Sequence, residues 1–236
     1  MSLRGFIKEA LPVSTATRLR SLEHSIRGRG QAGGSKVPFG EIYRSNSWGS
    51  PESVSGPGSE ILETEEIRAL LPTLLGRFNI RSLLDAPCGD FSWMSKVDLG
   101  SCDYIGAEVV PELVASNKSK YEQPGRRFIL ADLRKDRLAR SDLILCRDCL
   151  IHLSFRDAKA VLRNFRTSGS PLLLLTTDPS VKENRPVSTG GYRALNVRLP
   201  PFCLPEPLEI HRDRYPPAQG EILIDPHKHL GLFQLV

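Results

Sequence analysis

The sequence predicts an α/β fold built on a doubly wound, mostly parallel sheet. Between residues 80 and 178, short runs rich in Leu, Ile and Val alternate with stretches of helical pattern. Such alternation is typical of parallel sheets that carry helices on both faces. Each run ends in a polar residue, and ligands of these sheets bind at the carboxyl ends of the strands. The length of 236 residues, with 40% hydrophobic and 25% charged residues, suits one globular domain.

The strands and helices of this pattern can be placed in order along the chain. Strands are expected at 80–86, 102–110, 126–133, 141–148 and 170–178, and helices at 111–120 and 154–167. Ser59 is expected to cap an earlier helix through 61–76, because acidic residues follow in its first turns. An irregular, Pro-rich stretch then leads to a last strand at 228–236.

Residues 1–36 are expected to form a basic arm. The arm holds seven of the 32 Lys and Arg residues and two of the 27 acidic residues, which leaves 25 of each sign in the remainder. Leu19, Leu22 and Ile26 recur at helical spacing, so an amphipathic helix is expected at 15–27. A basic arm suits an anionic membrane surface or nucleic acid, and an ordinary solvated helix and a transit peptide are the alternatives.

Targeting and membrane signals are missing from the sequence. No apolar run approaches the roughly 18 residues of a spanning helix, and the N-terminus lacks the apolar region of a secretory signal. The five Cys residues show no framework spacing, which fits a reducing compartment. The sequence therefore predicts a cytoplasmic protein whose contact with the inner membrane face, if any, is made through the arm.

Acidic residues stand at the ends of the first three expected strands. The turn Asp85–Asp90 follows the first strand, Glu108 ends the second and Asp132 ends the third. Glu108 comes 19 residues after Gly89, and an acid at about this distance accepts hydrogen bonds from a ribose diol in dinucleotide-binding folds. A single such acid is often only solvated, but three in register with the turn favour a nucleoside ligand.

The first turn distinguishes between two kinds of cofactor. A nicotinamide dinucleotide needs a G-x-G-x-x-G turn, through which the backbone approaches the pyrophosphate. The turn here reads D-A-P-C-G-D, and its two acids repel a pyrophosphate. They suit a ligand that carries an ammonium or sulfonium group. The turn therefore favours S-adenosylmethionine over a nicotinamide cofactor.

Four stretches resemble the successive motifs of class I S-adenosylmethionine-dependent methyltransferases, which have a Rossmann-like sheet. They read "LLDAPCGDFSWM", "YIGAEVV", "FILADL" and "DLILCRDCLIHLS" and lie within about residues 80–178. The resemblance implies that the first turn wraps the methionine part, that Glu108 holds the ribose, and that Asp132 with Leu133 flanks the adenine. Pro87 stands where these enzymes usually have a second Gly. The implied cofactor-binding residues are Asp85, Ala86, Pro87, Gly89, Asp90, Glu108, Asp132, Leu133 and Arg147.

Two flanking stretches resemble a narrower bacterial group of methyltransferases that accompany polysaccharide and glycolipid synthesis. They read "EIYRSNSWGSPESVSGPGS" and "GGYRALNVRLPPFCLPEPLEI". The group includes the rhizobial nodulation enzymes that modify O-2 of fucose on lipochitooligosaccharides, and it implies a carbohydrate or glycolipid acceptor. Nucleic acid is not expected, because the body of the chain is neutral and the fourth strand lacks an N-P-P-Y motif. Another small-molecule acceptor, a nucleic-acid substrate and a non-enzymatic cofactor-binding regulator remain as alternatives.

Methyl transfer to a hydroxyl requires a group that removes the proton of the acceptor. His152 follows the fourth strand and is the first choice for this general base, with packing against the cofactor as its alternative role. Asp148 is expected to orient His152 or to act as the base itself. In a further alternative, Asp148 and Asp178 hold a divalent metal. The C-x-x-C at 146–149 is expected to belong to the core, so no metal site is assigned.

The domain is expected to span residues 37–236 and to carry two lid segments, 39–60 and 180–207. Both segments are rich in Gly, Ser and Pro and contain aromatic residues. Aromatic faces stack on sugar rings, and Arg donates hydrogen bonds to ring hydroxyls. Packing of the lids against the domain is an equally good explanation of these side chains. The candidate substrate-binding residues are Tyr43, Trp48, Tyr192 and Arg193.

Overall fold

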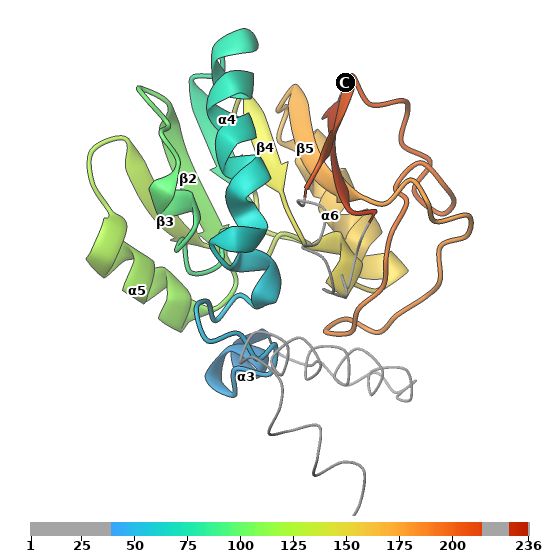
Figure 1. Ribbon diagram of the computed structural model, residues 1–236, viewed down its shortest axis with the longest axis horizontal. Coiled ribbons are helices and arrows are strands. Elements are labelled where there is room, and N and C mark those ends of the chain that lie inside the picture. Colours follow the sequence, from blue (N-terminus) through green and yellow to red (C-terminus); the bar gives the residue numbers. More distant parts are fainter. Residues whose placement is uncertain (1–38, 214–226, 236) are drawn as a thin grey trace, which may run out of the picture.

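The computed structural model describes residues 39–213 and 227–235, which build one seven-stranded sheet flanked by helices (Figure 1). The strands are β1 (Ser82–Asp85), β2 (Asp103–Glu108), β3 (Arg126–Leu130), β4 (Leu143–Cys146), β5 (Leu172–Thr177), β6 (Glu209–Arg212) and β7 (His229–Gln234). Their order across the sheet is β3-β2-β1-β4-β5-β7-β6. β7 runs antiparallel to β5 and β6, and the other pairs are parallel. The predicted mostly parallel sheet is confirmed, and the carboxyl ends of β1, β2 and β4 share one edge.

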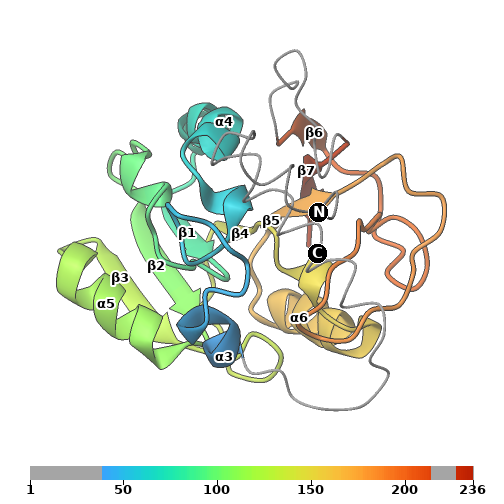
Figure 2. The same cartoon turned by 60° about the horizontal axis from the view of Figure 1, so that its bottom comes forward.

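Both faces of the sheet are buried, because consecutive strand residues point to opposite sides. In β1, Leu83 belongs to one apolar cluster and Leu84 to the other. Residues of α4 (Glu65–Arg77) and α5 (Pro111–Tyr121) join the Leu83 cluster, and residues of α6 (Phe155–Thr167) join the Leu84 cluster. Figure 2 shows α4 and α6 on opposite sides of the strands. The doubly wound arrangement follows from strands that are apolar on both faces.

The helices expected at 61–76, 111–120 and 154–167 are present, but the first of these three begins later than its sequence suggests. The prediction that Ser59 caps this helix is wrong, because Ser59 ends a short 3-10 turn. A second such turn, Leu62–Thr64, follows, and α4 begins at Glu65. In contrast, Ser154 caps α6 by accepting a hydrogen bond from the backbone N–H of Asp157 at 3.2 Å.

Two elements arise where the sequence indicates irregular chain. The first lid segment begins with a helix, α3 (Phe39–Arg44). The Pro-rich stretch after residue 200 ends in β6, which pairs with β7 at the edge of the sheet. The basic arm at 1–36 and the helix expected at 15–27 lie outside the described residues. Within the two described ranges, no helix is both long and apolar enough to cross a membrane.

Candidate active site

A cavity of about 270 Å³ opens at the carboxyl edge of β1, β2 and β4. The two lid segments contribute to its walls, the first through Phe39, Tyr43, Trp48 and residues 54–59, and the second through residues 190–192. The lining includes every predicted site residue except Ala86, Asp90 and Arg193. The structure thus brings the acids of three strand ends, the candidate base and the aromatic residues of both lids to one place.

Glu108 is held at the end of β2 by three backbone N–H groups. One carboxylate oxygen accepts hydrogen bonds from Val109 at 2.7 Å and Val110 at 3.0 Å, and the other accepts from Gly89 at 3.2 Å. Burial raises the pKa of Glu108, and these three bonds oppose the shift. Each carboxylate oxygen has two acceptor sites, so the oxygen that meets Gly89 keeps one for a ligand hydroxyl.

Asp85 is a carboxyl group buried at the end of β1, and only 2% of it is exposed. The Tyr104 hydroxyl donates a hydrogen bond to it at 2.7 Å. Burial raises the pKa of Asp85 to about 7; the charge of Glu108 adds to this shift and the Tyr104 bond opposes it. A positive ligand group beside Asp85 would favour its ionised form. The neighbouring Ala86 does not reach the cavity, and its N–H donates to the Leu145 carbonyl at 2.8 Å.

Asp90 holds the first lid segment rather than lining the cavity. One of its oxygens accepts from the Ser53 hydroxyl at 2.7 Å and from the Val54 N–H at 3.1 Å. The other accepts from the N–H and the hydroxyl of Ser92, at 3.0 and 2.7 Å. The predicted cofactor contact of Asp90 is therefore corrected. Its carboxylate fastens the lid segment to the turn after β1.

The lid segment lies so close to this turn that one position accepts only glycine without rearrangement. The N–H of Asp90 donates to the Ser55 hydroxyl at 3.0 Å. A Cβ on Gly89 would stand 2.3 Å from the same hydroxyl oxygen, and Gly89 has a positive φ of 55°. Both the contact and the backbone conformation thus require Gly89.

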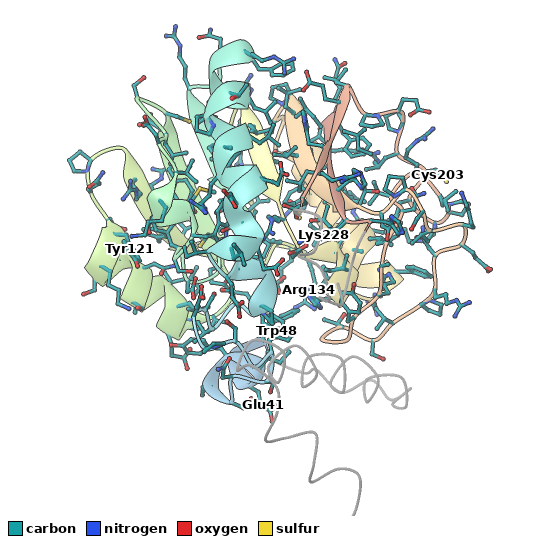
Figure 3. All side chains as sticks on the ribbon, in the orientation of Figure 1. Glu41, Trp48, Tyr121, Arg134, Cys203 and Lys228 are labelled. Carbon is teal, nitrogen blue, oxygen red and sulfur yellow. The ribbon has the colours of Figure 1, made fainter. Side chains whose placement is uncertain are left out.

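Asp132 reaches the cavity as half of an ion pair. The guanidinium of Arg134 donates to both carboxylate oxygens of Asp132, at 2.8 and 2.7 Å, and these bonds lower the pKa of Asp132. Arg134 also reaches Asp157 at 3.3 Å. Figure 3 labels Arg134 at the edge of the sheet where the cavity opens. Beside Leu133, a ligand therefore meets a carboxylate–guanidinium pair instead of an isolated acid.

Four charged side chains, of which Arg147, Asp213 and Lys228 are buried and Asp148 is partly exposed, form a network beside the end of β4. Arg147 donates from Nε to both oxygens of Asp213 at 3.0 Å and from Nη1 to the Gly58 carbonyl at 2.7 Å. The ammonium of Lys228, labelled in Figure 3, lies 2.7 Å from Asp148 and 2.9 Å from Asp213. The network has two cations and two anions, and it links β4, the first lid segment and the start of β7. Arg147 lines the cavity, but its guanidinium is engaged in these contacts.

Asp148 is a weak proton acceptor in this network. Although burial alone would raise its pKa, the charges of Lys228 and Arg147 hold the pKa well below its usual range. This environment favours His152 over Asp148 as the proton acceptor. The alternative in which Asp148 and Asp178 hold a metal also loses support. The ammonium of Lys228 donates a hydrogen bond to the Asp148 carboxylate. The Asp178 carboxylate accepts hydrogen bonds from the N–H and the hydroxyl of Ser180, at 2.8 and 2.6 Å.

His152 lies in the cavity wall with a defined ring orientation. Its Nδ1 is 2.8 Å from the Gly191 carbonyl oxygen. A carbonyl only accepts hydrogen bonds, so this contact assigns the hydrogen to Nδ1 and places the lone pair of the neutral ring on Nε2. The rings of Trp48 and Tyr192 flank the imidazole, with centroids at 5.2 and 5.8 Å. The Gly191 carbonyl thus orients the ring, and His152 also interacts electrostatically with Asp148.

The aromatic residues of both lids line the cavity as predicted. Tyr43, Trp48 and Tyr192 all contribute to its wall. Phe39 joins them, with its ring centroid 6.4 Å from that of Trp48. Trp93 is a further wall residue, and the guanidinium of Arg147 lies over its ring at 5.6 Å. The cavity therefore offers several flat apolar surfaces.

Arg193 lies behind the cavity wall and does not contribute to the lining. Its guanidinium donates to the Leu153 carbonyl at 2.6 Å and to the Leu150 carbonyl at 3.2 Å. The guanidinium carbon stacks over the Phe155 ring at 4.7 Å. The expectation that Arg193 binds a substrate hydroxyl is corrected, because its donors face the backbone of the turn before α6.

Three residues at the site, Trp93, Asp213 and Lys228, are not among those predicted from the sequence. Trp93 lies just beyond the first turn, and its position close to Asp90 in the sequence could have suggested it. Asp213 and Lys228 carry no such signal. β7 pairs with β5, and β6 pairs with β7. Asp213 follows β6 and Lys228 precedes β7, and these two residues pair with Arg147 and Asp148, which follow β4.

Comparisons with known proteins find likeness in structure and none in sequence. No protein-family profile and no curated protein sequence matches the chain. Human N-acetylserotonin methyltransferase, solved with S-adenosylmethionine, has a TM-score of 0.59 at 13% identity, over 94% of this chain and 67% of that one. The Burkholderia thailandensis 1,6-didemethyltoxoflavin-N1-methyltransferase, solved with 1,6-didemethyltoxoflavin and S-adenosylhomocysteine, has a TM-score of 0.58 at 17% identity, over 95% and 90%.

A third solved structure supports the same conclusion about the fold. An S-adenosylmethionine-dependent methyltransferase from Clostridium acetobutylicum has a TM-score of 0.50 at 10% identity, over 74% of this chain and 92% of that one. Identities this low establish the arrangement of the chain and nothing about its substrates. The seven-stranded sheet and its flanking helices are therefore the Rossmann-like fold of the class I S-adenosylmethionine-dependent methyltransferases.

Proposed function

We propose that this protein transfers a methyl group from S-adenosylmethionine to a hydroxyl group of a sugar. One observation carries the proposal. A single cavity presents acids from the ends of β1 and β2, Asp85 and Glu108, together with the imidazole of His152 between two aromatic rings. The acids suit a cationic nucleoside, and the imidazole suits a proton acceptor for a neutral hydroxyl.

The residues of the cavity fit S-adenosylmethionine better than a nicotinamide dinucleotide. Asp85 is buried, and a nearby ammonium or sulfonium would stabilise its ionised form. Glu108 keeps an acceptor site for a ribose hydroxyl. A pyrophosphate would be repelled by the ionised forms of these two carboxyl groups and, unlike a cation, would not favour their ionisation. When bound, the cofactor supplies a methyl carbon made electrophilic by the adjoining sulfonium.

The side chains of the cavity account for the remaining requirements of the reaction. Nε2 of His152 accepts the proton of the acceptor hydroxyl while the new oxygen–methyl bond forms and the sulfur–methyl bond breaks. The Gly191 carbonyl then stabilises the imidazolium through its Nδ1–H. Trp48 and Tyr192 pack beside the imidazole, limit its motion and reduce its exposure to water.

The choice of a sugar acceptor rests on the aromatic walls and on the flanking sequence. The faces of Tyr43, Trp48 and Tyr192 can stack against the C–H faces of a sugar ring. The stretches that contain these residues resemble the bacterial group described above. On that resemblance, the finer proposal is a deoxyhexose acceptor, with O-2 of fucose on a lipochitooligosaccharide nodulation signal as the specific candidate.

A labelling experiment tests the proposal. The protein is incubated with methyl-labelled S-adenosylmethionine and, separately, with glycolipid, oligosaccharide, protein, RNA and DNA, and the label is counted in each fraction. We expect label in the glycolipid or oligosaccharide fraction. The control variant His211→Gln should be as active as the unaltered protein, because His211 lies on β6 outside the cavity lining. Label found only in RNA or DNA would show that the substrate is a nucleic acid and not a sugar. Label in no fraction would refute the proposal.

A further inference from the structure

We infer that Arg193 is a positioning residue, which fixes the turn that carries His152 and thereby the direction of its Nε2. The inference rests on the proposed role of His152 as the base. Arg193 does not line the cavity, so it acts on the reaction only through the backbone around His152.

The turn before α6 is bound along its whole length by the second lid segment. The carbonyls of residues 150–153 all accept hydrogen bonds from residues 190–193. Arg193 donates from its backbone N–H to residue 151 at 3.1 Å and from its guanidinium to residues 150 and 153. Gly190 donates to the carbonyl of His152 at 2.8 Å. Three of these four carbonyls are therefore held by Arg193.

The same lid segment also orients the imidazole ring. The Gly191 carbonyl that fixes Nδ1 of His152 lies two residues before Arg193. Arg193 thus sets the distance between the backbone of the turn and the carbonyl that receives Nδ1–H. A shift of about 1 Å in a reacting group can reduce a rate roughly 100-fold. Loss of the guanidinium would therefore release both the backbone of the turn and the Gly191 carbonyl, which together set the orientation of the His152 ring.

The chemistry of Arg193 indicates a specific role beyond filling space. The residue is 7% exposed, and no carboxylate of the described ranges forms an ion pair with it. Burial lowers its pKa to about 10, so it remains protonated at neutral pH. A buried cation without a counter-ion is costly, and an apolar side chain would fill the same volume at lower cost. A planar fork can span two carbonyls that Lys cannot hold in the same geometry.

The test combines kinetics with the tautomer of His152. Arg193→Lys keeps the charge and the stem, Arg193→Met keeps the volume, and Arg185→Lys is the matched control at an exposed position of the same segment. In the two Arg193 variants we expect kcat to fall about 10- to 100-fold while the Kd for S-adenosylmethionine stays within about twofold. In Arg193→Ala, added ethylguanidinium should restore part of kcat. Nitrogen NMR of the His152 ring should show the Nδ1–H tautomer in the unaltered protein and a mixture in Arg193→Lys.

The outcomes separate this inference from the proposed function. An unaltered kcat in Arg193→Lys together with an unaltered His152 tautomer would overturn the inference. Equal losses of kcat and of cofactor affinity would also overturn it, because they would show a general structural role. If the unaltered protein transferred no methyl group, the proposed function would fail, and the His152 tautomer in Arg193→Lys would still decide whether Arg193 positions the ring. If Arg193→Met did not fold, the Lys variant and the rescue experiment would decide.

Discussion

At the scale of single residues, the protonation of the buried Asp85 carboxyl group is linked to the stability of the folded protein. Its pKa is raised to about 7 from the ordinary value of 3.8, mainly by burial. Between these two values the folded protein keeps a proton that the unfolded chain releases. Because the unfolded state then binds fewer protons, the stability contributed by this group is complete below about pH 4 and is lost as the pH rises through about 7.

Replacing Asp85 should remove this pH dependence. Asp85→Asn keeps the size and the acceptor for Tyr104 but cannot ionise. We expect urea unfolding to show that the variant gains stability relative to the unaltered protein as the pH is raised from about 5 to about 8. If the free energies of unfolding of the two proteins changed equally with pH, Asp85 would already be ionised in the folded state.

His152→Ala should slow methyl transfer far more than it weakens cofactor binding. A general base typically contributes roughly 10²–10⁴-fold to a rate, and His152 is the wall residue whose Nε2 carries a lone pair. Single-turnover rates measured beside the Kd for S-adenosylmethionine provide the test. Equal losses in the two quantities would make His152 a packing residue.

The sequence indicated which residues meet at the cavity better than it indicated what each does there. Glu108, predicted from its spacing to bind a ribose, does reach the cavity, where it accepts a hydrogen bond from the Gly89 N–H. The family resemblance assigns Asp90 to the cofactor, and the residue type of Arg193 suits a substrate hydroxyl. Their partners, the lid backbone and the turn before α6, come from distant parts of the chain and leave no local pattern.

At the scale of elements, the first lid segment is docked on the turn after β1 through Asp90. Asp90→Ala removes the acceptor of four hydrogen bonds, from Ser53, Val54 and Ser92. We expect a loss of roughly 1–3 kcal/mol in the free energy of unfolding and faster proteolysis within residues 50–60. Asp98→Ala, at an exposed position after the same strand, is the control. Unaltered proteolysis in Asp90→Ala would show that the lid is held by other contacts.

The elements that the sequence predicted well are those with a continuous apolar pattern. The five parallel strands and α6 follow from such runs. β6 did not, since its four residues alternate in burial next to two prolines, and only pairing with β7 makes them a strand. α4 begins at Glu65, later than expected, because two 3-10 turns, Pro57–Ser59 and Leu62–Thr64, take up the chain before it.

At the scale of the whole molecule, the excess of positive charge belongs to residues 1–36, which lie outside the described ranges. We propose that this arm brings the protein to a membrane that carries the acceptor. Each Lys or Arg near anionic lipid contributes about 1 kcal/mol. Deleting residues 1–36 should reduce sedimentation with anionic vesicles and leave turnover of a short soluble sugar nearly unaltered. Loss of cofactor binding in the shortened protein would make the arm part of the fold instead.

Calorimetric titration with S-adenosylmethionine tests the central claim most directly, because the acids at the strand ends define the ligand. We predict one site per chain, an affinity weakened by roughly 1–3 kcal/mol in Glu108→Ala, and no loss in Glu206→Ala, whose carboxylate pairs with Arg198 on the surface. NAD should give no binding heat. Tight binding of NAD, or undiminished affinity for S-adenosylmethionine in a folded Glu108→Ala protein, would contradict the account.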